Sequence, residues 1–130
     1  MNTRPIGILL LEDNPDDAYL LRLLLAKAPG QFQLTQAERL GDALKLLEAE
    51  ALDVVLTDLH LPDAVGEETV RGLFNGAKGV PILVLSGSDD PELHARILRE
   101  GACQILSKDN LNLATLSEAI RQAVEQCGKK

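Results

Sequence analysis

Five side chains that could react or bind a ligand each end, or directly follow, a short apolar run of the sequence: Glu12, Asp13, Asp58, Ser86 and Lys108. The three carboxylates could bind a metal ion, and a carboxylate can also attack phosphorus as a nucleophile. A lysine and a serine hydroxyl are suited to binding the oxygens of an anion. If these residues meet in space, the combination indicates phosphoryl-transfer chemistry.

The charges of the set predict how the work is divided. Three neighbouring carboxylates repel one another and cannot all stay ionised unless a cation joins them. Ligands that are all oxygen suit Mg²⁺, or Mn²⁺ in its place. Asp58 is the predicted nucleophile because it ends a buried run and precedes an open loop. Glu12 and Asp13 would hold the metal, while Lys108 and Ser86 would contact the phosphoryl group.

Short apolar runs alternate five times with segments of helical period, and this alternation predicts the elements that position the set. The runs cover residues 6–11, 32–38, 53–58, 80–87 and 103–108, and the helical segments cover 14–30, 39–51, 66–79, 89–101 and 112–127. Strict alternation predicts a parallel sheet with right-handed crossovers and helices on both faces. Reactive groups of such sheets collect at the carboxyl ends of the strands.

Composition excludes several classes of function. The net charge is −7 and no cluster of Lys or Arg occurs, which argues against direct binding to nucleic acid or to an anionic membrane. The two cysteines, Cys103 and Cys127, lack the spacing of a zinc site or a disulfide framework and are expected to be small buried residues. No run is long enough for a transmembrane helix, and residues 1–7 lack the build of a signal peptide. We therefore expect a cytoplasmic protein.

Over nearly its whole length the sequence resembles a receiver domain of bacterial two-component response regulators. The matching features are the acidic pair Glu12-Asp13, Asp58 in "TDLHLPDAVG" with the Leu61-Pro62 step and Gly66, Ser86 in "LVLSGSDD", and Lys108 in "ILSKDN". The resemblance implies one receiver domain over residues 1–130, with no output domain inside the chain. It also implies the doubly wound α/β (βα)5 flavodoxin-like fold, with helices on both sides of a five-stranded parallel sheet of order 2-1-3-4-5.

The resemblance further implies how the domain works. Asp58 would accept a phosphoryl group from a histidine kinase or a histidine phosphotransfer protein. Mg²⁺ would be held by Asp13, Asp58 and the backbone carbonyl of His60, with Glu12 acting largely through water. Ser86 would then move toward the phosphoryl group and repack the face formed by the fourth helix, fifth strand and fifth helix, which would signal to an output domain or partner. A homodimer stays open as an alternative.

Two positions depart from the family pattern. Ile105 stands where an aromatic residue often rotates with the switch, and an aliphatic side chain cannot supply that movement. Asp109 follows Lys108 where proline is usual. A cis peptide costs roughly 2.5–4 kcal/mol when proline does not follow, so the Lys108–Asp109 bond is predicted to be trans.

Other polar residues near the set receive structural interpretations. Asn14 is predicted to cap the first helix, with Asp16 and Asp17 in its first turn and Asp17 at the capping-box position. Asp63 is predicted to be a solvated turn residue. His60, two residues past Asp58, is expected to overhang the site and tune the access of water, and Ser88 could act likewise. The other histidine, His94, is expected to lie far from it on a helix surface.

Two other functions remain as alternatives. An aspartyl-nucleophile phosphohydrolase usually carries a second acid two residues after its nucleophile, where this chain has His60. A pure interaction module that has lost phosphorylation is the second, and Ile105 keeps it open. A serine hydrolase is disfavoured because Ser86 lies in no G-x-S-x-G elbow.

Overall fold

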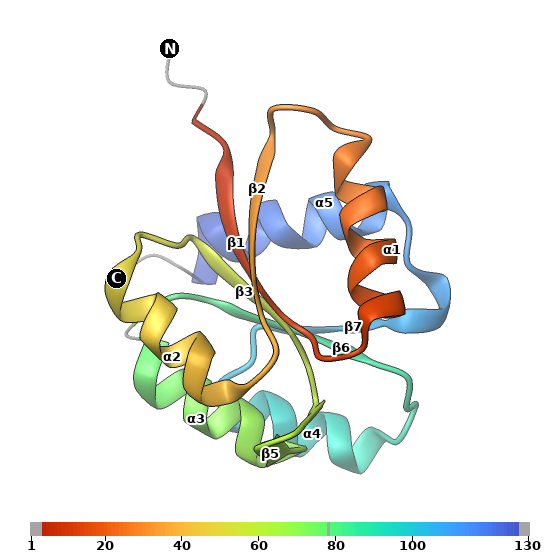
Figure 1. Ribbon diagram of the computed structural model, residues 1–130. Helices are drawn as coiled ribbons and strands as arrows, with labels where there is room; N and C mark the ends of the chain where they lie inside the picture. Colours follow the sequence, from red (N-terminus) through yellow and green to blue (C-terminus); the bar gives the residue numbers. More distant parts are fainter. Residues whose placement is uncertain (1–3, 78, 128–130) are drawn as a thin grey trace.

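The computed structural model describes residues 4–77 and 79–127, and its centre is a parallel sheet of five strands (Figure 1). The strands are β1 (Ile6–Leu11), β2 (Phe32–Ala37), β3 (Val54–Asp58), β6 (Ile82–Ser86) and β7 (Gln104–Ser107). Their order across the sheet is β2-β1-β3-β6-β7. Because β4 and β5 form a separate small hairpin, this order is the predicted 2-1-3-4-5, and the predicted fold class is confirmed.

Five α-helices cover the two faces of the sheet (Figure 1): α1 (Pro15–Ala26), α2 (Leu40–Ala49), α3 (Glu67–Ala77), α4 (Pro91–Arg99) and α5 (Leu113–Gln122). The last of them continues as a π-helical turn over Ala123–Cys127. Helices α1 and α5 pack on one face, and α2, α3 and α4 pack on the other. None of the helices in the described ranges combines the length and apolarity needed to cross a bilayer.

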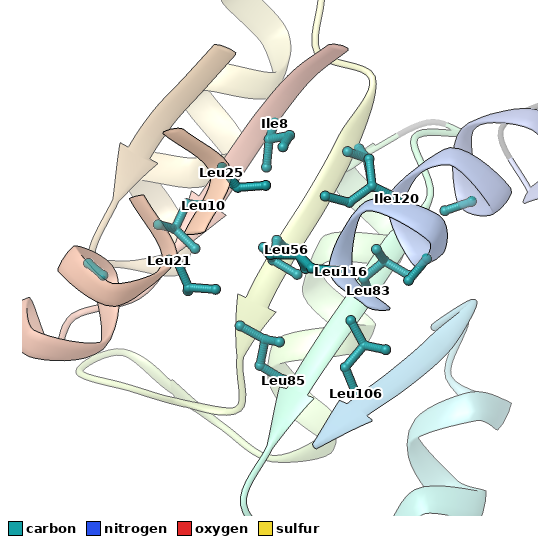
Figure 2. Close-up of a cluster of buried hydrophobic side chains, with 14 residues drawn as sticks. Ile8, Leu10, Leu21, Leu25, Leu56, Leu83, Leu85, Leu106, Leu116 and Ile120 are labelled. Atoms are coloured by element: carbon teal, nitrogen blue, oxygen red, sulfur yellow. The ribbon is translucent and has the colours of Figure 1, made fainter. Parts of the chain in front are cut away.

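Successive side chains of β1 point to opposite faces of the sheet and so contribute to both hydrophobic cores. Ile8 and Leu10 face α1 and α5, where they meet leucines of both helices (Figure 2). Leu9 and Leu11 point the opposite way, into the core beneath α2, α3 and α4. All four side chains are fully buried, as a strand covered on both faces requires. The nearly continuous apolar runs therefore predicted the central strands correctly.

The two cysteines, which are expected to be small buried residues, lie at the ends of secondary-structure elements. Cys103 lies just before β7 and packs partly buried against the core on the α1 and α5 side. The side chain of Cys127 lies outside the part of the chain that the structure describes.

Two glycines let α2 and α3 approach closely. Helix α3 is rich in glycine, and its sequence predicts only a weak helix, yet it runs for 11 residues. A Cβ placed on Gly72 would lie 2.7 Å from the nearest methyl carbon of Leu40, and one on Gly76 would lie 2.5 Å from that of Leu44. Both distances are shorter than real Cβ contacts, so larger residues would push the two helices apart.

The segment after Asp58 is a folded hairpin, although the sequence predicts an open loop there. Strand β4 (His60–Leu61) pairs antiparallel with β5 (Ala64–Val65). The backbone N–H of Gly66 donates to the carbonyl of Leu59 at 2.8 Å, and the hydroxyl of Thr69 donates to the same carbonyl at 3.1 Å. Gly66 has a φ of 63°, which favours glycine.

Asp63, at the tip of this hairpin, caps another helix and is not simply a solvated turn residue. Its carboxylate accepts hydrogen bonds from the backbone N–H groups of Leu40 at 2.8 Å and Gly41 at 3.1 Å. The N-cap residue of α2 is Arg39, whose side chain makes no capping hydrogen bond. The loop after Asp58 therefore satisfies the N-terminus of α2 from outside the helix.

We expect Asp63→Ala to lower the free energy of unfolding by about 0.5–2 kcal/mol, because it removes an acidic cap from a helix that has no cap of its own. Urea unfolding followed by circular dichroism measures the change. Asp63→Asn is the matched control, since its amide oxygen still accepts one of the two bonds and should retain part of the stability. Equal stability of the alanine variant and the wild type would contradict the capping role.

Candidate functional site

The structure brings the predicted site residues together at the carboxyl edge of the sheet. Asp58 and Ser86 are the last residues of their strands β3 and β6, and Lys108 begins a short 3₁₀ helix (Lys108–Asn110) directly after β7. Glu12 and Asp13 directly follow β1. One carboxylate oxygen from each of Glu12, Asp13 and Asp58 lies within 4.8 Å of the others. We call these three residues the acidic cluster.

Asp58 is held with one oxygen bound and the other turned toward a cation. Its Oδ1 accepts the backbone N–H of Leu59 at 2.7 Å, and its Oδ2 lies 3.4 Å from Nζ of Lys108. The side chain keeps 15% of its surface exposed. A carboxylate that is fixed in orientation, partly open to solvent and adjacent to an ammonium is arranged for attack on an electrophile that carries negative charge.

Glu12 is the most deeply buried acid of the cluster. Its Oε2 accepts the backbone N–H of Asn14 at 3.1 Å. Its Oε1 is the one buried side-chain oxygen or nitrogen within residues 4–77 and 79–127 that has no hydrogen-bond partner. Burial, followed by the nearby charge of Asp58, raises the pKa of Glu12 to about 7, although the Asn14 hydrogen bond and Lys108 oppose the shift.

These features fit a divalent cation. A buried oxygen that accepts no hydrogen bond is costly unless a ligand completes it, and the cluster supplies only oxygen donors, as Mg²⁺ prefers. Asp13, which is exposed, leaves one side open for water or for substrate oxygens. The residues present would therefore hold Mg²⁺ or Mn²⁺ through Glu12, Asp13 and Asp58. A ligand role for the His60 carbonyl stays a prediction.

The raised pKa of Glu12 makes the stability of the metal-free protein depend on pH. The folded-state pKa of Glu12, about 7, exceeds the ordinary value of 4.5. The stabilisation that protonated Glu12 gives to the folded state is therefore complete below pH 4.5 and is lost as the pH rises through 7. We expect metal-free protein to lose up to about 3 kcal/mol of unfolding free energy across this window. Urea unfolding at a series of pH values measures it.

Glu12→Gln is the control for this prediction, since its amide cannot ionise. The wild type should lose stability relative to Glu12→Gln as the pH rises, and Mg²⁺ should restore more stability at high pH than at low pH. A difference between the two proteins that does not vary with pH would show that Glu12 keeps an ordinary pKa.

Lys108 is surrounded by three carboxylates. Its Nζ donates a hydrogen bond to Oδ2 of Asp17 at 3.0 Å, and it lies 3.4 Å from Oδ2 of Asp58 and 3.5 Å from Oε1 of Glu12. Burial lowers the pKa of Lys108, but the Asp17 hydrogen bond and the charges of Asp58 and Glu12 outweigh it, so the net pKa is raised. The lysine is a permanent cation at neutral pH.

The contact with Asp17 corrects its sequence interpretation. Asn14 does cap α1, with its side-chain oxygen accepting the N–H of Asp16 at 2.8 Å and of Asp17 at 3.2 Å. The reciprocal half of the predicted capping box is wrong, because the N–H of Asn14 donates to Glu12. The carboxylate of Asp17 is thus free to reach across to Lys108, and it belongs to the site as well as to the helix.

Ser86 faces a cleft of about 340 Å³ beside Asp58. Its hydroxyl oxygen accepts the backbone N–H of Ser88 at 3.0 Å, and its hydroxyl lies 3.4 Å from the carbonyl of Ser88. His60 and Lys108 also line this cleft, as does Ser88 itself. His60 and Ser88 therefore lie where the sequence places them, at the mouth of the site.

His94 is a residue that the sequence interpretation missed. It lies on α4, and its Nε2 is 2.7 Å from the carbonyl oxygen of Ser88. Since a carbonyl only accepts, this nitrogen carries the proton. His94 therefore holds the loop that follows Ser86, and it is not remote from the site. Ser88 and His94 are six residues apart in the sequence. This spacing does not predict the contact unless the conformation of the loop between them is known.

The two departures from the family pattern have definite structural outcomes. No cis peptide bond occurs in the described residues, which confirms the trans Lys108–Asp109 bond. The N–H of Asp109 donates instead to the hydroxyl of Ser107 at 3.2 Å and starts the 3₁₀ turn. Ile105 packs against the core on the side of α2, α3 and α4.

A second and larger cavity, of about 580 Å³, adjoins the site along α1. Its walls include the apolar side chains of Leu20, Leu23 and Leu24, and it reaches Asp17 and Lys108. Leu20 and Leu23 are both exposed. This groove is lined mainly by leucines, whereas the cleft next to Asp58 also contains the side chains of Ser86 and Lys108, which can bind an anion.

Comparison with known proteins gives a consistent result. Residues 8–121 match the family model described as the response regulator receiver domain. The chain is 27% identical over 133 residues to the two-component response regulator ORR1 of rice (japonica), which covers 91% of this chain and 58% of that protein. The chain spans about half the length of the curated relatives that it matches first.

Solved structures agree on the fold. The receiver domain of an HD domain-containing protein from Pseudomonas fluorescens Pf-5 superposes with a TM-score of 0.84 at 28% identity, covering 96% of this chain and 90% of that one. The receiver domain of a sensor histidine kinase from Pseudomonas aeruginosa PAO1 superposes with a TM-score of 0.80 at 22% identity, covering 94% and 99%. That second structure has a magnesium ion coordinated in its active-site cleft.

Proposed function

The chain belongs to the response regulator receiver domain family, and from this premise we propose that it is a phosphorylation switch whose acceptor is Asp58. The observation that carries the proposal is that Asp58 lies next to both the other two acids of the cluster and Lys108. The nucleophile then has beside it both a candidate cation site and a positive charge for the incoming phosphoryl oxygens.

The donor is proposed to be a phosphohistidine of a histidine kinase or of a histidine phosphotransfer protein. An oxygen of Asp58 forms a bond to phosphorus while the phosphorus–nitrogen bond breaks, and the imidazole keeps the electron pair of that bond. The Leu59 N–H holds the carboxylate in orientation, and Lys108 neutralises the phosphoryl oxygens. Glu12, Asp13, Asp58 and the proposed His60 carbonyl would hold Mg²⁺ or Mn²⁺, which would supply positive charge to neutralise the remaining phosphoryl oxygens.

Ser86 is proposed to carry the signal away from the site. Its hydroxyl is engaged with the backbone of Ser88 in this structure, and a phosphoryl group on Asp58 offers a more strongly charged acceptor. When the hydroxyl turns to that acceptor, the loop held by His94 loses one of its bonds. The movement would reach α4 and the adjoining face of β7 and α5, where an output domain or partner protein would read it.

The remaining features of the proposal concern the cellular setting. The domain is proposed to act in the cytoplasm on a protein partner, with no contact to nucleic acid or membrane. Its only catalysis would be its own phosphorylation and slow dephosphorylation, so it is not proposed as a metabolic enzyme.

Phosphorylation by a small donor tests the proposal. We expect the protein, incubated with acetyl phosphate and Mg²⁺, to gain the mass of one phosphoryl group, and peptide mapping should locate it on Asp58. Chelation of Mg²⁺ by EDTA should prevent the gain, because the charge of the acidic cluster is then not neutralised. Absence of labelling in the presence of Mg²⁺ would favour the interaction module without phosphorylation.

A further inference from the structure

The hydrogen bond between Asp17 and Lys108 has no place in the phosphorylation chemistry proposed above. Asp17 lies on α1 and is not a member of the acidic cluster. Yet it makes the shortest of the three carboxylate contacts of Lys108, at 3.0 Å against 3.4 Å for Asp58 and 3.5 Å for Glu12. The ammonium is therefore bound most closely by the one acid that would touch neither the metal nor the phosphoryl group.

We propose that Asp17 is a positioning residue that holds the Lys108 ammonium on the α1 side of the site until a phosphoryl group arrives on Asp58. This inference rests on the proposed function, because it assigns to Lys108 the task of binding the phosphoryl oxygens. Asp17 acts on the reaction only through the lysine.

The contact should have opposite effects on cations and anions. Lys108 lies close to Asp58 and Glu12, so its charge opposes a divalent cation at the acidic cluster. By drawing the ammonium to itself, Asp17 weakens this repulsion and favours Mg²⁺. A phosphoryl group on Asp58 needs the same ammonium, and Asp17 competes for it. An interaction that is stronger before the phosphoryl group arrives lowers the affinity for that group.

The test compares Asp17→Asn with the wild type in two binding measurements. The probes are Mg²⁺ alone, titrated by calorimetry, and beryllofluoride at saturating Mg²⁺, which mimics a phosphoryl group on a carboxylate. We expect Mg²⁺ to bind about two- to five-fold more weakly and beryllofluoride to bind about two- to five-fold more tightly, as the loss of a partly exposed ion pair allows. Simple misfolding would weaken both.

Asp16→Asn is the matched control. Asp16 occupies the same helical turn and carries the same charge, but its side chain is exposed and makes no hydrogen bond or ion pair within residues 4–77 and 79–127. The control should show less than half of each effect, since its charge acts only over a screened distance. Asp17→Glu keeps a carboxylate able to reach the lysine and should return both affinities toward those of the wild type.

A double variant identifies the lysine as the intermediary. In a Lys108→Met background, Asp17→Asn should change the affinity for Mg²⁺ no more than Asp16→Asn does. An undiminished effect of Asp17→Asn in that background would overturn the proposal. Equal effects of Asp17→Asn and Asp16→Asn in the wild-type background, or a weaker affinity for beryllofluoride, would overturn it too.

The two levels of the proposal fail in different ways. A wild-type protein that binds Mg²⁺ but gains no phosphoryl group from acetyl phosphate would contradict the proposed function. The Mg²⁺ measurements would still decide the role of Asp17, because they depend only on the charge of Lys108 beside the acidic cluster. Weaker Mg²⁺ binding in Asp17→Asn than in Asp16→Asn supports the positioning role, and equal binding overturns it.

Discussion

Asp58→Asn is expected to gain no phosphoryl group from acetyl phosphate, at any concentration of Mg²⁺. The amide oxygen carries no negative charge and is not a nucleophile toward phosphorus. The substitution keeps the shape of the side chain and an acceptor for the Leu59 N–H, so the fold should be retained. Intact-protein mass spectrometry measures the result, and circular dichroism verifies the fold.

Asp63→Asn is the matched control for this variant. It makes the same chemical change five residues further along the chain, at the tip of the hairpin that follows Asp58. Asp63 contacts the N-terminus of α2 and no residue of the acidic cluster, so this variant should be labelled like the wild type. Labelling of Asp58→Asn at another residue, such as Asp13, would show that the nucleophile is assigned wrongly.

The second large effect concerns the metal. Asp13→Asn is expected to weaken Mg²⁺ binding by at least about tenfold, since residues that merely support a metal ligand are already worth that much. Asp13 is the exposed member of the acidic cluster, so its loss should remove a ligand with little effect on the core. Titration calorimetry measures the affinity, and the Mg²⁺ dependence of phosphorylation should move by the same factor.

Asp16→Asn serves as the control here too, because it removes one negative charge from an exposed position nearby. A Mg²⁺ affinity of Asp13→Asn equal to that of Asp16→Asn would mean that the cluster attracts the cation only through its overall charge. In that case Asp13 would not be a ligand, and the metal site would have to be assigned again.

The site could be predicted from the sequence because its geometry follows from the topology. Glu12 follows β1 and Asp58 ends the adjacent strand β3, while Lys108 follows β7, which is separated from β3 by one strand. Parallel strands bring their carboxyl ends to one edge, so residues distant in sequence meet there whatever the details of packing. The apolar runs that define the strands therefore also define the position of the candidate site.

Contacts made by the reach of side chains could not be predicted in this way. Asp17 and Lys108 are 91 residues apart. An acidic residue in the first turn of a helix is expected for electrostatic reasons alone, so the sequence gives no reason to look for a partner of Asp17. The contact between Asp63 and the N-terminus of α2 could not be predicted either. Polar residues are common in turns, so an aspartate there needs no further explanation. In both cases a local explanation was sufficient, and the tertiary contact left no separate signal in the sequence.

Glycine in α3 shows the opposite limitation. Helix propensity alone makes Gly72 and Gly76 unfavourable, so the sequence predicts a weak helix. Their closeness to Leu40 and Leu44 gives both positions a reason in packing. Tertiary packing therefore overrides local preference at this pair of helices, as single-sequence reasoning cannot show.

The hairpin that follows Asp58 has a consequence for the speed of partner recognition. Leu59 and Leu61 are buried, and the carbonyl of Leu59 accepts two hydrogen bonds. A segment that is already ordered has little conformational entropy to lose when a donor protein covers it. Encounter with the proposed phosphohistidine donor would thus be a nearly rigid docking event, in which the rate is set by diffusion and orientation and not by folding of the loop.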